Sequence, residues 1–215
     1  MKTIRFTFIF AIAAVVLTSC DWFNPVIPPN SKQYYYFLHI NFKDAEGNDL
    51  ATPLADDMYK TAEGKPWAGE IDPDKFSLEL FPADADIPEE RITTILTLSK
   101  FDDQHYMQPT NPDGTYGPEG DWYLNFRCII QGGADILQDH LIYKFKCPTI
   151  FGDDSVHDIT AYWNEGYQFD KLSCYPSCPK VVIDGVEYTV VEGRTYEAES
   201  SALYIGYFTE VVIDR

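Results

Sequence analysis

Apolar and polar residues alternate along several short stretches of this chain, with the two-residue period of a half-buried β-strand. The longest such stretch begins at Tyr34 and ends at Phe42, with tyrosine, leucine, isoleucine and phenylalanine on one face. The same pattern predicts further strands at 76–80, 92–98, 122–130, 141–147, 156–163, 180–183, 186–191 and 203–213. Asp184-Gly185 stands between two of them, and this dipeptide between β-branched runs is typical of a tight β-hairpin.

These segments predict an all-β fold of about nine strands. We expect an antiparallel β-sandwich, preferably immunoglobulin-like, although a jelly roll or an open barrel gives the same pattern. The composition agrees, because 15 Tyr and 14 Phe against 3 Met favour strands over helices. The region 34–215 is long enough for one domain with a sizeable core, and we place a single β-sandwich domain there.

The first 20 residues follow a different pattern. Lys2 and Arg5 give a positive start, and the apolar run that follows ends at Leu17. This order is typical of a secretory signal peptide, and the run is shorter than the roughly 20 apolar residues of a spanning helix. The segment Leu17-Thr18-Ser19-Cys20 resembles the lipobox of bacterial lipoproteins. We therefore expect a signal peptide at 1–19, cleavage before Cys20 and acylation of Cys20.

Acylation of Cys20 predicts a lipid-anchored protein of the bacterial cell envelope, on the periplasmic face or the surface of the outer membrane. Residues 20–33 contain three prolines, and we expect them to form an extended tether. The formal charge of −18 becomes −20 when Lys2 and Arg5 leave with the signal peptide. That charge excludes a nucleic-acid partner and opposes adhesion to anionic lipid, so the lipid on Cys20 is the expected membrane contact.

Four cysteines remain besides Cys20, and an even number in an exported chain suggests disulfides. The favoured pair is Cys174–Cys178, because Cys-Tyr-Pro-Ser-Cys is rich in turn formers. Cys128 and Cys147 both fall on the predicted core face, where they form either a second bridge or two buried thiols. A four-cysteine zinc site is disfavoured, because structural zinc sites show tighter cysteine pairs. We therefore expect no bound metal and no other cofactor.

Two histidines follow aspartate pairs, in Asp102-Asp103-Gln104-His105 and Asp153-Asp154-Ser155-Val156-His157. An imidazole beside carboxylates suits acid–base or metal chemistry, but acidic turns before strands have the same composition. The sequence contains no HExxH, GxSxG or P-loop motif, so we assign no catalytic residue. The acidic stretches 44–49 and 113–121 are candidate calcium loops, although a plain β-turn explains the first more simply.

Tryptophans in loops are candidates for stacking on sugar rings. Trp67 lies in a loop between two glycines and is the best candidate for an exposed, ligand-binding aromatic side chain. Trp122 and Trp163 fall on apolar alternating faces, so we expect both in the core.

The lipobox, the tether, the turn at 44–50 and the segment 147–154 with His157 and Trp163 resemble small uncharacterised lipoproteins of Bacteroides-type gut bacteria. The resemblance spans most of the chain and implies no particular activity. In that group an acidic run after the lipidated cysteine accompanies export to the cell surface. Here only Asp21 is acidic, and Trp22-Phe23 follow it, so both the inner leaflet and the cell surface remain alternatives for this chain. Asp154-Ser155-Val156 also resembles the O-glycosylation motif of those bacteria, which implies Ser155 as a glycosylation site.

These observations lead us to expect a non-enzymatic binding or interaction module on the cell envelope, with a carbohydrate or an envelope protein as its ligand. One alternative is a hydrolase that uses acidic residues near His105 or His157, with or without a divalent cation. Another is a structural component of a fimbria-like assembly, joined through an exposed strand edge.

Overall fold

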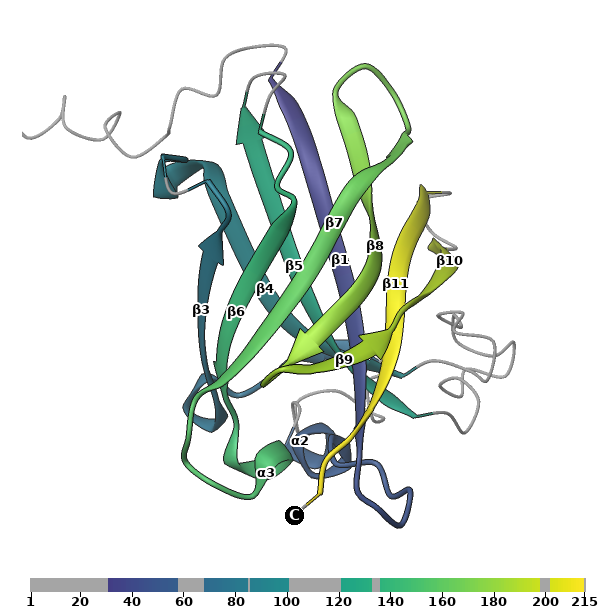
Figure 1. Ribbon diagram of the computed structural model, residues 1–215. Coiled ribbons are helices and arrows are strands. Elements are labelled where there is room, and N and C mark those ends of the chain that lie inside the picture. The colour runs from purple at the N-terminus through teal and green to yellow at the C-terminus, as the bar shows by residue number, and fades with distance from the viewer. Residues whose placement is uncertain are drawn as a thin grey trace, which may run out of the picture. The chain divides into compact units, whose positions relative to one another are not determined.

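Strands dominate the computed structural model, which describes residues 31–57, 68–84, 86–100, 121–132, 136–197 and 202–214 (Figure 1). All of them belong to one structural unit, residues 31–215. The strands are β1 (Lys32–Lys43), β2 (Ala68–Glu70), β3 (Ser77–Pro82), β4 (Ile92–Lys100), β5 (Trp122–Gly132), β6 (His140–Lys146), β7 (His157–Gln168), β8 (Ser173–Ile183), β9 (Val186–Thr189), β10 (Val191–Glu197) and β11 (Ala202–Val212). Short helices occur at α2 (Thr52–Asp57) and α3 (Pro148–Phe151), with 3₁₀ turns at Pro73–Lys75 and Glu89–Arg91.

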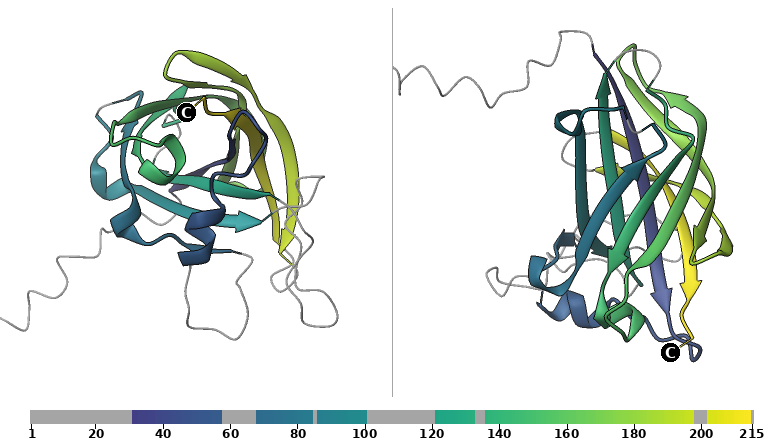
Figure 2. Two further views of the ribbon diagram at one scale, coloured as in Figure 1. Left: turned by 90° about the horizontal axis from the view of Figure 1, so that it is seen from below. Right: turned by 60° about the vertical axis from the view of Figure 1, so that its left-hand side comes forward.

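The strands join into one curled, mixed sheet with the order β2-β4-β5-β1-β8-β7-β6-β3 (Figures 1 and 2). One edge of β1 pairs with β5, and two different strands share the other edge. Gln33 and Tyr34 pair with β8, whereas the segment from Leu38 to Lys43 pairs with β11. Both of these pairings are parallel, and β9 and β10 extend the sheet beside β8 and β11.

The structure confirms the all-β class but not the antiparallel, immunoglobulin-like β-sandwich that the sequence suggested. The strands belong to one sheet instead of two packed sheets, and β1 has two parallel neighbours. Period-2 alternation shows only that one face of a strand is buried, and a curled sheet buries that face as well as a sandwich does. The pattern therefore could not distinguish these architectures.

The inner face of β1 forms the centre of the hydrophobic core. Tyr36, Leu38, Ile40 and Phe42 alternate along it and are completely buried. Phe145 of β6 packs edge-to-face against an aromatic ring of β5, with 5.2 Å between the ring centroids. The alternation read from the sequence thus identifies the core-facing side of β1 correctly.

The outer face of β1 is also buried, which its polar residues did not predict. His39 Nδ1 donates a hydrogen bond to Asn125 Oδ1 over 2.5 Å, and the His39 ring stacks on Phe208 with centroids 4.5 Å apart. Asn125 Nδ2 donates in turn to Thr97 Oγ1 over 3.1 Å. Burial lowers the pKa of His39 to about 3, so its imidazole is neutral in the folded protein. A β-carbon on Gly206 would lie 2.5 Å from His39 Nε2, so only glycine fits there.

The predicted hairpin at Asp184-Gly185 is confirmed. Ile183 pairs with Val186, and both turn residues have positive φ, 48° for Asp184 and 86° for Gly185. Glycine and aspartate tolerate this backbone conformation, which a two-residue hairpin turn needs.

The predicted Cys174–Cys178 disulfide is absent from the structure, in which Cys128, Cys147, Cys174 and Cys178 are all free. Both members of the favoured pair lie in β8, four residues apart in sequence. At about 3.3 Å per residue an extended strand separates their Cα atoms by roughly 13 Å, whereas a disulfide needs less than about 7 Å. The turn composition was misleading because Pro176 and Pro179 lie opposite register shifts in β7, where the ladder is interrupted and proline is tolerated.

Candidate functional site

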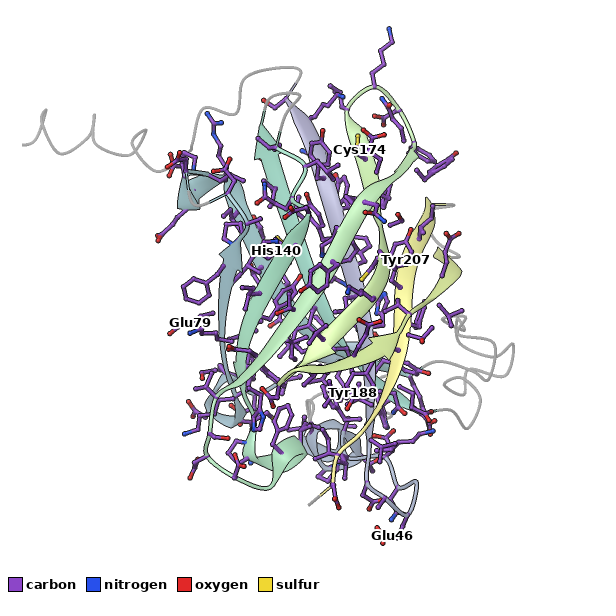
Figure 3. The ribbon with its side chains drawn as sticks, viewed as in Figure 1. Glu46, Glu79, His140, Cys174, Tyr188 and Tyr207 are labelled. Atoms are coloured by element: carbon purple, nitrogen blue, oxygen red, sulfur yellow. The ribbon has the colours of Figure 1, made fainter. Side chains whose placement is uncertain are left out.

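A pocket of about 380 Å³ lies at the end of the sheet where β1 begins and the β7–β8 hairpin closes. We call it the end pocket, and Figure 3 labels one of its residues, Cys174. Its lining residues come from β1, the 136–139 segment, β7 and β8: Lys32, Tyr34, Leu137, Glu165, Gly166, Gln168, Cys174 and Pro176. Its volume falls in the range of small-molecule sites, about 300–1,000 Å³.

The lining combines an ammonium group, a carboxylate, an amide and an aromatic ring. Lys32, Glu165 and Gln168 are partly or fully exposed, whereas Tyr34 is buried. These groups supply donors and acceptors that suit a polar ligand. The lining residues form no recognisable sequence motif, because they lie on separate segments that come together only in the folded sheet.

Gly166 shapes one wall of the end pocket. A β-carbon there would lie 2.0 Å from the backbone oxygen of Tyr175 and 2.6 Å from the backbone nitrogen of Ser177. The register of β7 against β8 shifts at this point, between Asn164 and Tyr167. Glycine therefore allows the bulged part of β7 to approach the backbone of β8.

Buried polar groups support the core beyond the end pocket. Tyr36, two residues beyond Tyr34 on the same face of β1, accepts a hydrogen bond at Oη from the backbone N–H of Gln138 over 2.8 Å. Burial raises the pKa of Tyr36, so its hydroxyl is neutral. The Trp163 ring packs edge-on against it with centroids 5.1 Å apart. These contacts hold the 136–139 segment, which contributes Leu137 to the pocket.

His157 forms a second cluster at the other end of β8, next to the β8–β9 turn. Its Nδ1 donates to Asp184 Oδ2 over 2.6 Å, and its Nε2 lies 3.0 Å from Ser155 Oγ. The backbone N–H of Asp158 donates to the other oxygen of Asp184 over 2.9 Å. The imidazole also stacks on Phe151 with centroids 3.6 Å apart. Serine, histidine and aspartate thus stand in the order of a nucleophile, a base and its orienting acid.

Asp153 changes the chemistry of this cluster. Ser155 Oγ donates to Asp153 Oδ1 over 2.6 Å, and the backbone N–H of Ser155 donates to the same oxygen over 2.8 Å. These hydrogen bonds lower the pKa of Asp153. The Ser155 hydroxyl therefore donates its proton to a carboxylate instead of to the imidazole. The hydrogen bonds of Asp153 and Ser155 stabilise the loop between α3 and β7.

The structure also places the other residues named from the sequence. Trp122 and Trp163 are buried, 8% and 2% exposed, as predicted. In the acidic turn at 44–49, both Asp44 carboxylate oxygens accept hydrogen bonds from Asn48, which supports the β-turn interpretation over a calcium loop. Ser155 is exposed.

Other predicted features lie outside the described residues, namely Cys20, Trp67, His105, the whole signal peptide, residues 20–30 of the tether and residues 113–120 of the acidic loop. Within the described ranges, no three His, Cys, Asp or Glu side chains gather closely enough to hold a metal ion. The helices of these same ranges are all too short or too polar to cross a bilayer.

Comparison of the chain with models of known protein families, with curated proteins and with solved structures finds no match.

Proposed function

We propose that this protein is a lipid-anchored binding module of the bacterial cell envelope, akin to the Bacteroides-type lipoproteins that its sequence resembles. In this proposal Cys20 carries the lipid, residues 20–33 form the tether, and the end pocket binds the ligand. The favoured ligand is a carbohydrate, and an envelope protein that presents a polar group to the pocket is the alternative. The proposal needs only the curled sheet and its pocket, and does not depend on an immunoglobulin-like arrangement.

The observation that carries the proposal is the mixed chemistry of the end pocket. Glu165 and Gln168 offer hydrogen-bond acceptors and an amide donor, Lys32 adds a cationic donor, and Tyr34 contributes an aromatic ring to the lining. Sugars present many hydroxyl groups together with apolar ring faces, and pockets of this composition complement both. The negative charge of the chain, −18 over all residues, disfavours anionic ligands in general and is compatible with a neutral sugar.

A glycan array and a pull-down from envelope extract, both with detergent-solubilised mature protein, test this function. Glu165→Ala should weaken binding by about 10-fold or more, because a hydrogen bond to a charged group contributes about 1.5 kcal/mol or more. Gln168→Ala should weaken it by about 5-fold, because a hydrogen bond to a neutral amide contributes about 1 kcal/mol. Glu79→Ala is the matched control, since Glu79 is an exposed strand glutamate far along the sheet from the pocket (Figure 3). Negative results in both assays, together with robust hydrolysis of a polysaccharide, would refute the binding function.

Hydrolysis at the His157 cluster is the second candidate function. One observation favours it: Ser155 Oγ lies 3.0 Å from His157 Nε2, and His157 Nδ1 lies 2.6 Å from Asp184. If the cluster is catalytic, His157→Ala abolishes turnover, in addition to any loss of stability from the missing Phe151 contact. If His157→Ala instead lowers the melting temperature and affects no activity, the cluster is structural.

A further inference from the structure

Three exposed apolar side chains gather at the tip of the β7–β8 hairpin. Tyr167 is 50% exposed, Phe169 is 56% exposed and Leu172 is 38% exposed. Lys171 lies between the last two in sequence. We call Tyr167, Phe169 and Leu172 the hairpin tip. Large apolar side chains that are exposed together mark a surface that contacts another phase or molecule.

The tip has a defined conformation because Asp170 closes the turn. Asp170 Oδ1 accepts from the backbone N–H groups of Leu172 and Ser173, over 2.6 and 2.7 Å. The backbone N–H of Phe169 donates across the turn to the oxygen of Ser173 over 3.0 Å. The carboxylate of Asp170 thus accepts hydrogen bonds from the backbone of its own turn, while the apolar side chains on either side of it remain exposed.

Aromatic packing supports the hairpin beneath its tip. Tyr167 pairs with Tyr175 across the two strands. The Tyr175 ring stacks on Tyr35 of β1, with centroids 5.0 Å apart and 16° between the planes. The hairpin is therefore fixed to β1 by side chains as well as by backbone pairing.

The hairpin tip lies where the proposed tether joins the domain. The backbone N–H of Gln33 donates to the oxygen of Leu172 over 2.6 Å, and Gln33 pairs with Ser173. Eleven residues separate Cys20 from Lys32, the first residue of β1. Even fully extended, that segment reaches about 40 Å, at no more than roughly 3.6 Å per residue. An acylated Cys20 would keep the tip within this distance of the bilayer, so that a weak membrane contact is enough for frequent docking.

We propose that the hairpin tip inserts into the headgroup region of the bilayer that holds the Cys20 lipid. This inference rests on the proposed lipid anchor. Tyrosine favours the membrane interface, and phenylalanine and leucine gain free energy when they leave water for the acyl boundary. The contact depends on apolar burial instead of on charge, because the chain as a whole carries −18, and the described segments 32–33 and 167–175 contain only two cationic residues, Lys32 and Lys171. Docking would orient the β7–β8 end of the sheet, and with it the end pocket, toward the membrane.

Vesicle binding without the lipid isolates this contact. The mature chain with Cys20→Ala has no acylation site, and we expect it to bind vesicles of phosphatidylethanolamine and phosphatidylglycerol weakly. The triple variant Tyr167→Ser, Phe169→Ser, Leu172→Ser in that chain should partition about 10-fold less, a difference of about 1.4 kcal/mol. The control Val186→Ser removes an equally exposed side chain, 55%, at the other end of β8 and should partition as the parent does. Equal partitioning of the triple variant and the parent, with unchanged melting temperatures, would overturn the proposal.

Photocrosslinking in the native, lipidated protein gives a second readout. A benzophenone amino acid at Phe169 should form adducts with lipid in the membrane, whereas the same group at Val186 should not. Protein adducts without lipid adducts at Phe169 would mean that the tip binds a protein partner, and would also overturn the proposal. The mass of the mature chain reports acylation of Cys20 separately, so a failure of docking is distinguishable from a failure of the lipid anchor.

Discussion

Protonation of the buried His39 should make this fold sensitive to acid in a predictable pH range. The pKa of His39 falls from 6.5 to about 3 on folding, chiefly because burial disfavours the charged imidazole. Between these values the unfolded chain binds a proton that the folded chain does not. Acidification therefore favours the unfolded state, and the stability that depends on neutral His39 is complete above pH 6.5 and decreases as the pH falls toward 3.

The magnitude follows from the size of this window. Each pH unit below 6.5 changes the free energy of unfolding by about 1.4 kcal/mol, so roughly 3 kcal/mol is lost at pH 4.5. His39→Gln removes the titrating group, and it also loses the ring stacking on Phe208, so its stability at pH 7 should be lower. The relevant quantity is the difference between the two proteins as a function of pH. The variant should lose roughly 3 kcal/mol less than the parent between pH 7 and pH 4.5.

Urea unfolding of both proteins at several pH values between 7 and 4.5 measures this difference. Carboxylates with lowered pKa values, such as Asp153 and Asp170, also contribute to acid sensitivity, but they are present in both proteins and cancel in the comparison. Parallel pH profiles for the parent and His39→Gln would refute the reasoning. Such profiles would mean that His39 has the same pKa in the folded and unfolded states, and hence that water reaches its ring in the folded protein.

Three further outcomes follow from the same structure. Gly206→Ala should lower the free energy of unfolding by about 1–3 kcal/mol, measured by urea denaturation, because the new methyl group would lie 2.5 Å from His39 Nε2; an unchanged midpoint would contradict this packing. Alkylation of the native protein should modify the half-buried Cys174 before Cys178, because burial raises the pKa of the Cys178 thiol to about 12. Mass spectrometry gives the order of modification, and a Cys174–Cys178 disulfide found without added reductant would contradict the free thiols. His157→Ala should lower the melting temperature, read by calorimetry, because the variant loses the 3.6 Å stacking contact with Phe151; a gain in stability would be inconsistent with this role.

The sequence predicted the positions of most strands because alternation is a local property. The inner face of β1, the hairpin at Asp184-Gly185 and the buried Trp163 all follow from residues within a few positions of each other. The pairing of strands could not be predicted in the same way, because the parallel pairing of β1 with β11 joins segments about 170 residues apart and leaves no local sequence signal. The first half of β8 was missed because Pro176 and Pro179 suggest a turn until the register shifts in β7 are known.

The candidate site was harder to predict than the fold. The end pocket exists only because β1, β7 and β8 meet at one end of the sheet, and neither Lys32 nor Gln168 belongs to a recognisable motif. The cluster at His157 was visible in part, as an imidazole near Asp153 and Ser155. Its closest partner, Asp184, is 27 residues away in sequence and appeared only as a turn residue.

The divided edge of β1 determines the order in which this protein is able to complete its fold. A chain made from its N-terminus contains β1 early, but the strand that covers Leu38–Lys43 is synthesised about 170 residues later. Until β11 is present, that stretch has an open edge that is free to pair with other chains. Closing so large a loop is slow, so a chain in which β11 has not yet paired is exposed to misassembly for longer than one made of sequential hairpins. Loss of β11 should therefore lower the folding yield and increase aggregation, because the edge of β1 at Leu38–Lys43 would stay unpaired.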